Sequence, residues 1–488
     1  MNSALGFAVA FVAGWAVMAL EILAGRLLAP VFGYSVYQWG ALIGTVMAAL
    51  AAGYALGGRV GDGPKARAWL LWHIGASCGY TFLLPWLAGT LVPPTRELGP
   101  ILGAVVASLL LVGPQSFLLA TVSPIVTRMT ASGGIATSAG RVYAISTLGS
   151  IGGVFFTSFF SIPELGTRAS GFVCALLLGL AAVALIVARR KAAGGAAAAV
   201  LAAVTAVCIG SNPRLGAGVL FEGESIHSWL RVADQDGRRF LYMNYEKGVQ
   251  THIVPGQLLT NTYRDYFLLG PYLNGGRKIL VLGVAGGASV RQAIQVFPDS
   301  EVTGVDLDPL ALEVGRKYFE LEGLPRMRLV TADARWFLSR TTEIYDVIGV
   351  DLYVTGHIPF FAATREFFEL VRARLSPEGI VIMNIYAPGR ERDALVGPLL
   401  KTLQSVIPGL AVIDGVNVMV FGSRDPSFDT ASVRKRLEAP IGPGPLAQVA
   451  RVALMNLMPA PGGGDWPIFT DDRSDVEFRT FRNLNSAR

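Results

Sequence analysis

The sequence predicts an N-terminal bundle of membrane-spanning helices followed by an α/β domain with a mostly parallel sheet. Three observations support this organisation. Residues 1–210 of the 488 contain repeated apolar runs with few charges, whereas residues 211–488 hold most of the Asp, Glu, Lys and Arg. Residues 278–306 then read as a strand, a glycine turn, a helix and a second strand that ends in an acid. A chain of this length exceeds one core and should contain several domains.

The helical domain, residues 1–210, is predicted from apolar segments of about 20 residues, the length that crosses a bilayer. These segments are 5–32, 40–58, 69–91, 99–127, 142–162, 168–188 and 193–210. The first is not a cleavable signal peptide, because it continues through Glu21 and Arg26 and further spans follow. We expect Pro114 and Pro124 to kink the fourth.

Two regions make up the rest of the chain. Residues 211–275 contain short strands separated by turn residues such as Asp236-Gly237, which predicts a small antiparallel β-sheet. In residues 276–488 strands and helices alternate, which predicts a parallel sheet with helices on both faces. The alternating segments are 278–283, 288–297, 301–306, 309–320, 327–331, 345–351, 363–375 and 379–385.

The glycine turn after the first of these strands predicts a nucleoside site. Gly283, Gly286 and Gly287 let the backbone approach a ligand, and the following helix presents free N–H groups. Asp306, about 20 residues on, suits the ribose hydroxyls. The alternative is that the glycines only form a tight turn.

Three acids follow three strands, at the edge of the sheet where ligands bind in such folds. Asp306 suits the ribose, Asp333 suits the adenine amino group, and Asp351 would face the reacting end of the cofactor. The alternative for each is a helix cap or a turn.

With these motifs the soluble half resembles the spermidine synthase family of polyamine aminopropyltransferases, in the Rossmann-like methyltransferase superfamily. The resemblance covers roughly residues 223–390 and includes Gln250, Tyr263, the VLGVAGG turn, VDLDP and the Asp333-Ala334 pair. The whole chain resembles bacterial membrane-fused spermidine synthase-like proteins, through EILAGRLLAPVFG (21–33), AGRVYAISTLGSIGG (139–153) and TDDRSDVEF (470–478). The resemblance implies a Rossmann-like methyltransferase-type domain and S-adenosylmethionine or its decarboxylated form as cofactor, with a methylthioadenosine-like product. It implies these cofactor-binding residues: Gln250, Tyr263, Arg264, Gly283, Gly286, Gly287, Asp306, Asp333 and Ala334.

Four acids that bind cations in the family are replaced in this chain, and the one at Gly286 binds the amine of the cofactor's aminopropyl group. The resemblance places Gly286, Val354, Leu259 and Thr260 where spermidine-forming members carry carboxylates. Because a desolvated polyamine needs paired carboxylates, these replacements argue against ordinary spermidine synthesis. Arg264, which stands where the family has a histidine, favours the intact cofactor with its carboxylate. The alternative is a surface arginine paired with neighbouring Asp265.

We therefore expect a membrane-embedded transferase that moves an aminopropyl-type or methyl group to a small-molecule amine or a membrane-borne lipid acceptor. Asp351 is the expected catalytic residue, assisted by Tyr353 or His357. Asp471 and Asp472 either form a turn or add negative charge to the acceptor pocket. The alternative function is a transporter or sensor that binds a nucleoside or polyamine without turnover.

Positive charge falls on alternate loops, which places the N-terminus in the cytoplasm of a multi-pass inner-membrane protein. The charges are Arg59/Lys65/Arg67, Arg128/Arg141 and Arg189/Arg190/Lys191. Seven spans would put the soluble domain outside and six would put it inside. We expect it in the cytoplasm, where the cofactor is made, with 193–210 in the membrane interface or re-entering.

The lipid bilayer is the expected macromolecular partner. Lys and Arg form no run interleaved with aromatic residues, so we expect no nucleic acid. Cys78, Cys174 and Cys208 all lie in apolar segments, which excludes disulfides and a thiolate zinc site from the soluble half, and we expect no metal. The sequence leaves a homo-oligomer open.

Overall fold

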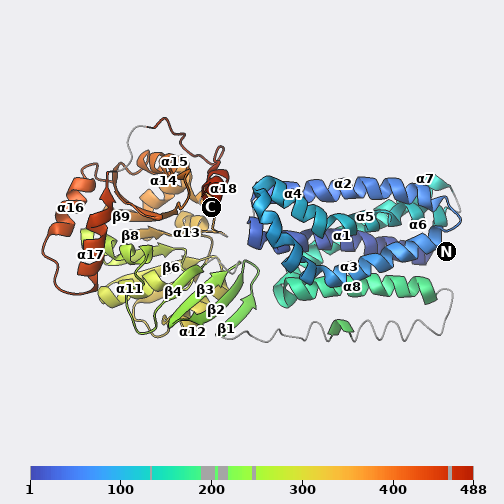
Figure 1. Cartoon of the computed structure of the whole chain (residues 1–488), viewed down its shortest axis with the longest axis horizontal. Helices are drawn as coiled ribbons and strands as arrows, with labels where there is room; N and C mark the ends of the chain where they lie inside the picture. Colours follow the sequence, from blue (N-terminus) through green and yellow to red (C-terminus); the bar gives the residue numbers. More distant parts are fainter. Residues whose placement is uncertain are drawn as a thin grey trace. The chain divides into compact units, whose positions relative to one another are not determined.

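A computed structural model describes residues 2–33, 35–131, 134–187, 204–206, 218–244, 249–354, 356–459 and 464–486. The chain divides into two compact units, Met1–Arg214 and Leu215–Arg488 (Figure 1).

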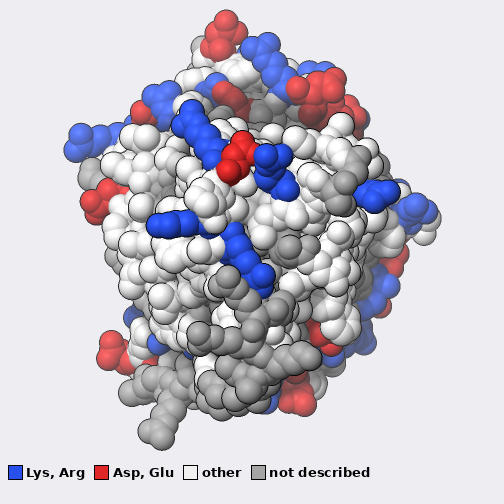
Figure 2. All heavy atoms as spheres, turned by 90° about the vertical axis from the view of Figure 1, so that its right-hand side faces the viewer, with Lys and Arg blue, Asp and Glu red and all other residues white. Residues whose placement is uncertain are grey.

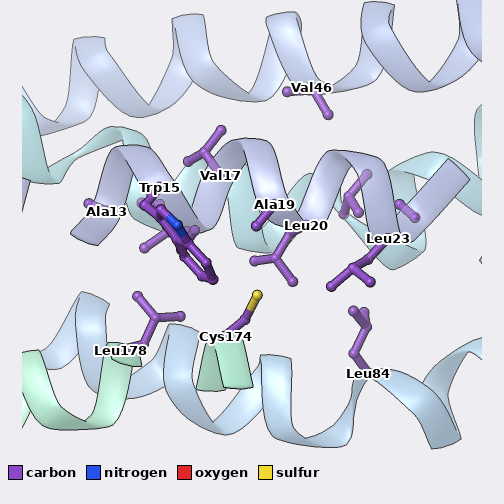
Figure 3. Close-up of a cluster of buried hydrophobic side chains, with 14 of the residues drawn as sticks. Ala13, Trp15, Val17, Ala19, Leu20, Leu23, Val46, Leu84, Cys174 and Leu178 are labelled. Atoms are coloured by element: carbon purple, nitrogen blue, oxygen red, sulfur yellow. The ribbon is translucent and has the colours of Figure 1, made fainter. Parts of the chain in front are cut away.

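The first unit is a bundle of helices around α1. Its helices are α1 (Ser3–Phe32), α2 (Val36–Gly61), α3 (Ala66–Thr95), α4 (Pro100–Leu111), α5 (Gly113–Ala120), α6 (Val122–Thr130), α7 (Ile135–Phe156) and α8 (Ile162–Val187). Figure 3 shows Leu20 and Leu23 of α1 among apolar side chains from other helices, including Val46 of α2 and Cys174 of α8. Glu21 and Arg26, the charged residues of α1, are half-buried.

Among the described residues, three helices are long and apolar enough to cross a membrane, namely Ser3–Phe32, Val36–Gly61 and the merged helix Ile135–Val187. A fourth candidate is the bent pair Ile101–Leu111 and Gly113–Thr130, whose axes differ by 48°. The bend lies next to Pro114, as expected from the loss of a backbone donor. The merged helix breaks at Gly166, which has φ 79° and ψ 169°.

Helices cover the first six predicted spans, although α3 is not among the membrane-crossing candidates. Residues 193–210 lie outside the described residues apart from 204–206. The number of membrane crossings therefore stays a prediction.

The second unit begins with a four-stranded antiparallel sheet in the order β1-β2-β3-β4. Its strands are β1 (Val219–Glu224), β2 (Trp229–Gln235), β3 (Arg238–Met243) and β4 (Val249–Ile253). Asp236 and Gly237, both with positive φ, form the tight turn between β2 and β3. The 3₁₀ segment η3 (Tyr263–Leu268) and α10 (Leu269–Asn274) then lead into the main sheet.

The main sheet has eight strands in the order β12-β10-β11-β9-β8-β5-β6-β7. The strands β5 to β9 are parallel and β10 to β12 are antiparallel. The strands are β5 (Lys278–Leu282), β6 (Glu301–Asp306), β7 (Met327–Thr331), β8 (Tyr345–Val350), β9 (Leu375–Tyr386), β10 (Gly409–Ile413), β11 (Asn417–Ser423) and β12 (Leu457–Met458). The helices are α11 (Ala288–Val296), α12 (Pro309–Tyr318), α13 (Ala334–Arg340), α14 (Arg365–Arg374), α15 (Arg392–Gln404), α16 (Thr430–Glu438), α17 (Pro445–Asn456) and α18 (Val476–Ser486).

Alternate side chains of each strand enter two separate cores. Leu280 and Leu282 of β5 pack with α13, α14 and α15, whereas Ile279 and Val281 pack with α11, α16 and α17. Helices therefore cover both faces, and the predicted mostly parallel sheet is confirmed. The strand order reverses between β5 and β8, so the carboxyl ends of these strands flank the crevice where ligands bind in this fold class.

Candidate active site

The glycine turn after β5 is shaped by Asp306, at the end of β6. The Asp306 Oδ2 atom accepts hydrogen bonds from the backbone N–H groups of Val284 (2.9 Å) and Ala285 (2.8 Å). Its Oδ1 atom accepts one from the N–H of Asp308 at 2.9 Å. A carboxylate has about four lone-pair sites, so roughly one remains for a ribose hydroxyl rather than the two that the sequence led us to expect. Burial raises the pKa of Asp306, and these backbone bonds oppose the rise.

The small sheet covers the other side of this turn. The N–H of Gly286 donates to the Thr251 hydroxyl on β4 at 3.0 Å. A Cβ at Gly286 would lie 2.8 Å from the Thr251 methyl carbon, so the close packing of β4 excludes a side chain there. Gly287, with φ 77°, begins α11.

Asp333 and Ala334 stand at the start of α13, next to the end of β7. The Asp333 Oδ1 atom accepts the N–H of Trp336 at 2.8 Å and thereby caps the helix. Ala334 is buried. The helix cap, which the sequence had offered as the alternative for Asp333, is therefore present, and contact with adenine stays a prediction.

Asp351 is the centre of a polar network at the end of β8. Its Oδ2 atom accepts a hydrogen bond from the Tyr263 hydroxyl (3.1 Å), and its Oδ1 atom accepts one from the Asn384 amide (2.8 Å). Asn417, at the start of β11, in turn donates to the Asn384 oxygen at 2.8 Å. Burial raises the pKa of Asp351, while the nearby charge of Arg264 opposes the rise. The carboxylate is thus oriented by two donors and is a better proton acceptor than an exposed Asp.

The sequence reasoning missed Asn384 and Asn417. Asn384 is only 2 % exposed, in the apolar strand IVIMNIY. A lone amide in such a run, close to the carboxyl end of a parallel strand, was the available signal.

Tyr353 and His357 make further contacts that the sequence did not indicate, and their expected assistance to Asp351 stays a prediction. The Tyr353 hydroxyl donates to the Asn384 carbonyl (3.1 Å) and accepts the N–H of Tyr386 (2.6 Å), so it fixes the backbone of β9. The His357 ring stacks on Phe481 of α18, with centroids 6.2 Å apart. These contacts indicate a positioning role for Tyr353 and packing against the C-terminal helix for His357.

Gln250 and Arg264 adjoin the network. The Arg264 guanidinium lies 4.5 Å over the Tyr263 ring and donates to the Gln250 carbonyl. Arg264 is 6 % exposed, so the alternative of a surface arginine is wrong. Its proposed partner Asp265 instead binds the Thr260 backbone and hydroxyl, the Asn261 N–H and the Gln292 amide.

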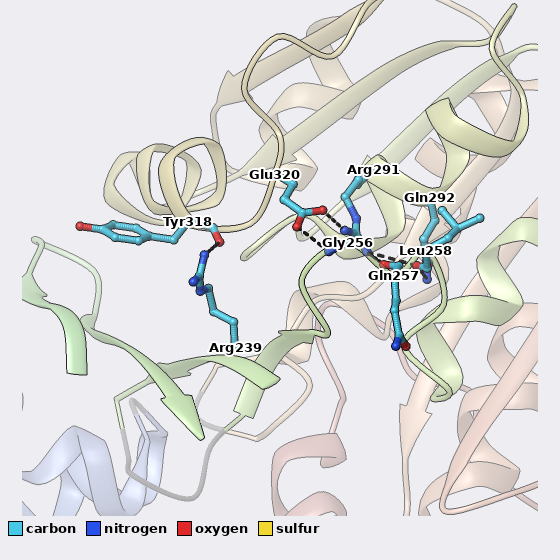
Figure 4. A network of polar contacts seen from close by, with 8 residues as sticks. All are labelled: Arg239, Gly256, Gln257, Leu258, Arg291, Gln292, Tyr318 and Glu320. Atoms are coloured by element: carbon cyan, nitrogen blue, oxygen red, sulfur yellow. Dashed lines mark hydrogen bonds and ion pairs between the residues drawn. The ribbon is translucent and has the colours of Figure 1, made fainter. Parts of the chain in front are cut away.

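A buried arginine holds the loop that leads to Tyr263 (Figure 4). Arg291 of α11, 1 % exposed, pairs with Glu320 and donates to the carbonyls of Gln257 (2.7 Å) and Leu258 (3.1 Å). Gln292 donates to the same Leu258 carbonyl at 3.0 Å. The segment between β4 and η3 is therefore anchored to α11, which fixes where Tyr263 meets Asp351.

Asp471 and Asp472 form a turn. The backbones of Thr470 and Arg473 exchange two hydrogen bonds across it, each 3.0 Å. Asp471 pairs with Arg335 through both oxygens, which lowers its pKa. Of the two alternatives for these acids, the geometry therefore favours a turn over added negative charge in the acceptor pocket.

The part of the chain that holds this site is similar to known proteins. Residues 269–409 match the protein family described as "Spermine/spermidine synthase domain". A probable polyamine aminopropyl transferase of Bifidobacterium longum is 34% identical over 188 residues, which are 38% of this chain and 42% of that protein. A polyamine aminopropyltransferase of Vibrio vulnificus is 28% identical over 184 residues, 36% of this chain and 62% of that protein. The chain thus spans less than two thirds of the length of either relative.

Other relatives carry different names. An eEF1A lysine and N-terminal methyltransferase of Bos taurus is 33% identical over 159 residues, 29% of this chain and 22% of that protein. A crystal structure of a probable spermidine synthase from Corynebacterium glutamicum aligns with 53% of this chain and 100% of its own, at 20% identity and a TM-score of 0.38. The matched region contains the glycine turn, Asp306, Asp333, Asp351 and Asn384. Residues 269–409, in the C-terminal unit, thus match the spermine/spermidine synthase domain, and this unit is similar to polyamine aminopropyltransferases.

Proposed function

We propose that the C-terminal unit is a transferase that moves a carbon group from S-adenosylmethionine or its decarboxylated form to an amine or lipid acceptor. The observation that carries this proposal is the Asp351 carboxylate, oriented by Tyr263 and Asn384 at the crevice beside the glycine turn. The names of the relatives, aminopropyltransferases and methyltransferases, support both versions of the reaction.

The residues around the crevice fit an adenosyl group. The glycine turn offers a close backbone approach, and Asp306 has an acceptor site left. Asp333 follows β7 of the main sheet, and Gln250 precedes Thr251, whose hydroxyl binds the turn. When bound, the sulfonium supplies an activated carbon: the acceptor nitrogen's lone pair forms the new bond while the carbon–sulfur bond breaks and leaves its electron pair on sulfur. Asp351 accepts the proton that the acceptor nitrogen loses, and Tyr263 and Asn384 hold its two oxygens for that transfer.

We assign the acceptor to a cavity of about 430 Å³ beside this network. Tyr263 and Asn417 line it, and both lead to Asp351 through hydrogen bonds. Two lining residues are carboxylates: Asp414 is neutralised by Arg392, whereas Asp265 keeps its single negative charge and accepts four hydrogen bonds from neutral groups. Because a polycation needs unpaired carboxylates when it is desolvated, this cavity suits an acceptor with at most one positive charge.

Putrescine, with two charges, is therefore expected to be no better an acceptor than 4-amino-1-butanol, which has the same carbon chain and one charge. The purified full chain would be supplied with each cofactor form and each amine, and release of methylthioadenosine and S-adenosylhomocysteine would be measured. Putrescine turnover of about 1–10 per second, typical of enzymes, together with little turnover of the aminoalcohol, would contradict this view of the cavity. Binding of the nucleosides without release of either product under any condition would favour the alternative transporter or sensor.

We further propose that the helical unit is embedded in the inner membrane with its arginine-rich end in the cytoplasm. Arg128 at the end of α6 pairs with Asp62 at the end of α2 (2.9 Å), and Arg67 of α3 donates to the Leu185 carbonyl of α8 (2.8 Å). These contacts bring three chain segments with basic residues to one end of the unit, where Figure 1 also marks the N-terminus. Figure 2 views this end and shows Lys and Arg side chains gathered on a mostly uncharged face. Such an arrangement is typical of the cytoplasmic side of a membrane bundle.

The end of α8 lies at this same end, so a C-terminal unit in the cytoplasm is expected if residues 188–217 do not cross the bilayer. A reporter that is active only in the cytoplasm, fused after Arg488, should give signal, and the same reporter fused between α1 and α2 should give none. Signal from a periplasm-specific reporter after Arg488 would establish a further crossing. It would also separate the domain from its cofactor supply.

A further inference from the structure

Within the described part of the chain, Arg264 is a buried cation without a carboxylate partner. It is 6 % exposed, its guanidinium lies over the Tyr263 ring, and it donates to the Gln250 carbonyl. A guanidinium has five N–H donors, and a neutral carbonyl and a ring do not neutralise its charge.

The two nearest candidate anions are already engaged. Asp265 is used by Thr260, Asn261 and Gln292. Asp351 receives Tyr263 and Asn384, and it feels the charge of Arg264 without forming an ion pair with it. Among the residues that the structure describes, no carboxylate pairs with Arg264. A buried charge left in this state is costly unless a ligand supplies the counter-ion.

We infer that Arg264 binds the carboxylate of the amino-acid tail of S-adenosylmethionine, so that the site selects the intact cofactor and the transferred group is methyl. This inference rests on the proposed transferase function. In the balanced step, the acceptor lone pair forms the bond to the methyl carbon, the methyl–sulfur bond breaks onto sulfur, and the acceptor proton passes to Asp351. Arginine suits this role because its planar donors match a carboxylate in a two-point contact.

The glycine turn supplies a second, independent argument. In the intact cofactor the cationic amine of the tail has its own carboxylate beside it, whereas the decarboxylated form leaves that amine in need of an acid from the protein, and residues 283–287 contain none. The acid cannot simply be restored at Gly286, since a Cβ there would lie 2.8 Å from Thr251 and 3.1 Å from Phe319. The close packing of the turn therefore leaves no room for the acidic side chain that the decarboxylated form requires.

Binding calorimetry on the purified full chain tests the inference with ligand pairs that differ only in the tail. S-adenosylmethionine should bind at least ~10-fold more tightly than its decarboxylated form, from the strength of hydrogen bonds between charged groups. Arg264→Gln should weaken S-adenosylhomocysteine by at least ~10-fold and leave methylthioadenosine, which has no amino-acid tail, unchanged. Arg264→Lys, which keeps the charge, should recover part of the loss.

The outcomes separate the inference from the function on which it rests. Equal or tighter binding of the decarboxylated cofactor by the wild-type chain would overturn the inference and leave the transferase proposal standing. Equal losses of both nucleosides in Arg264→Gln would also overturn it, because the side chain would then support the fold or the nucleoside half. Failure of the wild-type chain to bind either nucleoside would overturn the proposed function itself. The wild-type comparison needs no variant and decides the matter if Arg264→Gln does not fold.

Discussion

Asp351→Asn is expected to lower turnover by ~10²–10⁴-fold, the usual contribution of a general base, while leaving the affinity for the nucleoside product unchanged. The amide oxygen can still accept a hydrogen bond from Tyr263 or Asn384, so the network largely persists, but an amide cannot take the acceptor's proton. Product release gives the turnover, and calorimetry with S-adenosylhomocysteine or methylthioadenosine gives the affinity. Turnover within about tenfold of the wild type would assign the proton to another group, since even a modest general base contributes more.

The same residue predicts a pH dependence. The pKa of Asp351 is raised by burial, and only the ionised carboxylate accepts a proton. Turnover of the wild type should therefore fall as the pH falls through this raised pKa, at a pH above the ordinary range of Asp near 3.9. The residual turnover of Asp351→Asn should lack this acidic limb.

Asp346→Asn is a matched control on the same strand. Asp346 stands at the amino end of β8, where its carboxylate accepts the N–H groups of Arg277 and Lys278, both at 3.0 Å. Asp346 has the same side chain as Asp351 but lies at the opposite end of β8. Its replacement should affect stability and leave the pH profile of turnover unaltered.

The strands around the site could be predicted from the sequence because their apolar patterns agree with their turns. β6 and β7 begin and end at the predicted residues, whereas β5 ends one residue earlier than predicted. Acids that follow parallel strands must reach one edge of the sheet, so the neighbourhood of Asp306, Asp333 and Asp351 was predictable as well.

The partners of individual side chains could not be predicted in this way. His357 stacks on Phe481, which follows it by a long stretch of chain, and no local pattern encodes that contact. Arg264 resembled a surface residue because its neighbour is an acid, yet Asp265 is recruited by Gln292 of α11. Hydrogen-bond partners depend on which elements pack together, and that information arises only when the two sheets and η3 are assembled.

Gly283→Ala should be the most damaging single methyl group in the site. Gly283 has φ 87°, and a Cβ there would lie 2.2 Å from the carbonyl oxygen of Asp351. Left-handed backbone costs about 1–2 kcal/mol for a residue with a side chain, and overpacking adds about 1–3 kcal/mol. The free energy of unfolding of the C-terminal unit should therefore fall by roughly 2–5 kcal/mol, a large part of the stability of a typical domain. Nucleoside binding should be lost with it, because β5 and β8 must separate where Asp351 leaves the sheet.

Gly323→Ala separates the two causes. Gly323 has φ 75°, nearly the same backbone conformation, but a Cβ there would have no neighbouring atom within 4 Å. Denaturant unfolding of the full chain should therefore show a loss of only about 1–2 kcal/mol, the cost of the backbone conformation alone, and calorimetry should show normal nucleoside binding. Equal losses of unfolding free energy in the two variants would mean that the backbone around Gly283 and Asp351 can move apart to accept a methyl group at little cost. The carboxyl end of β8 would then not be held by the glycine turn, and the position of Asp351 would need another cause.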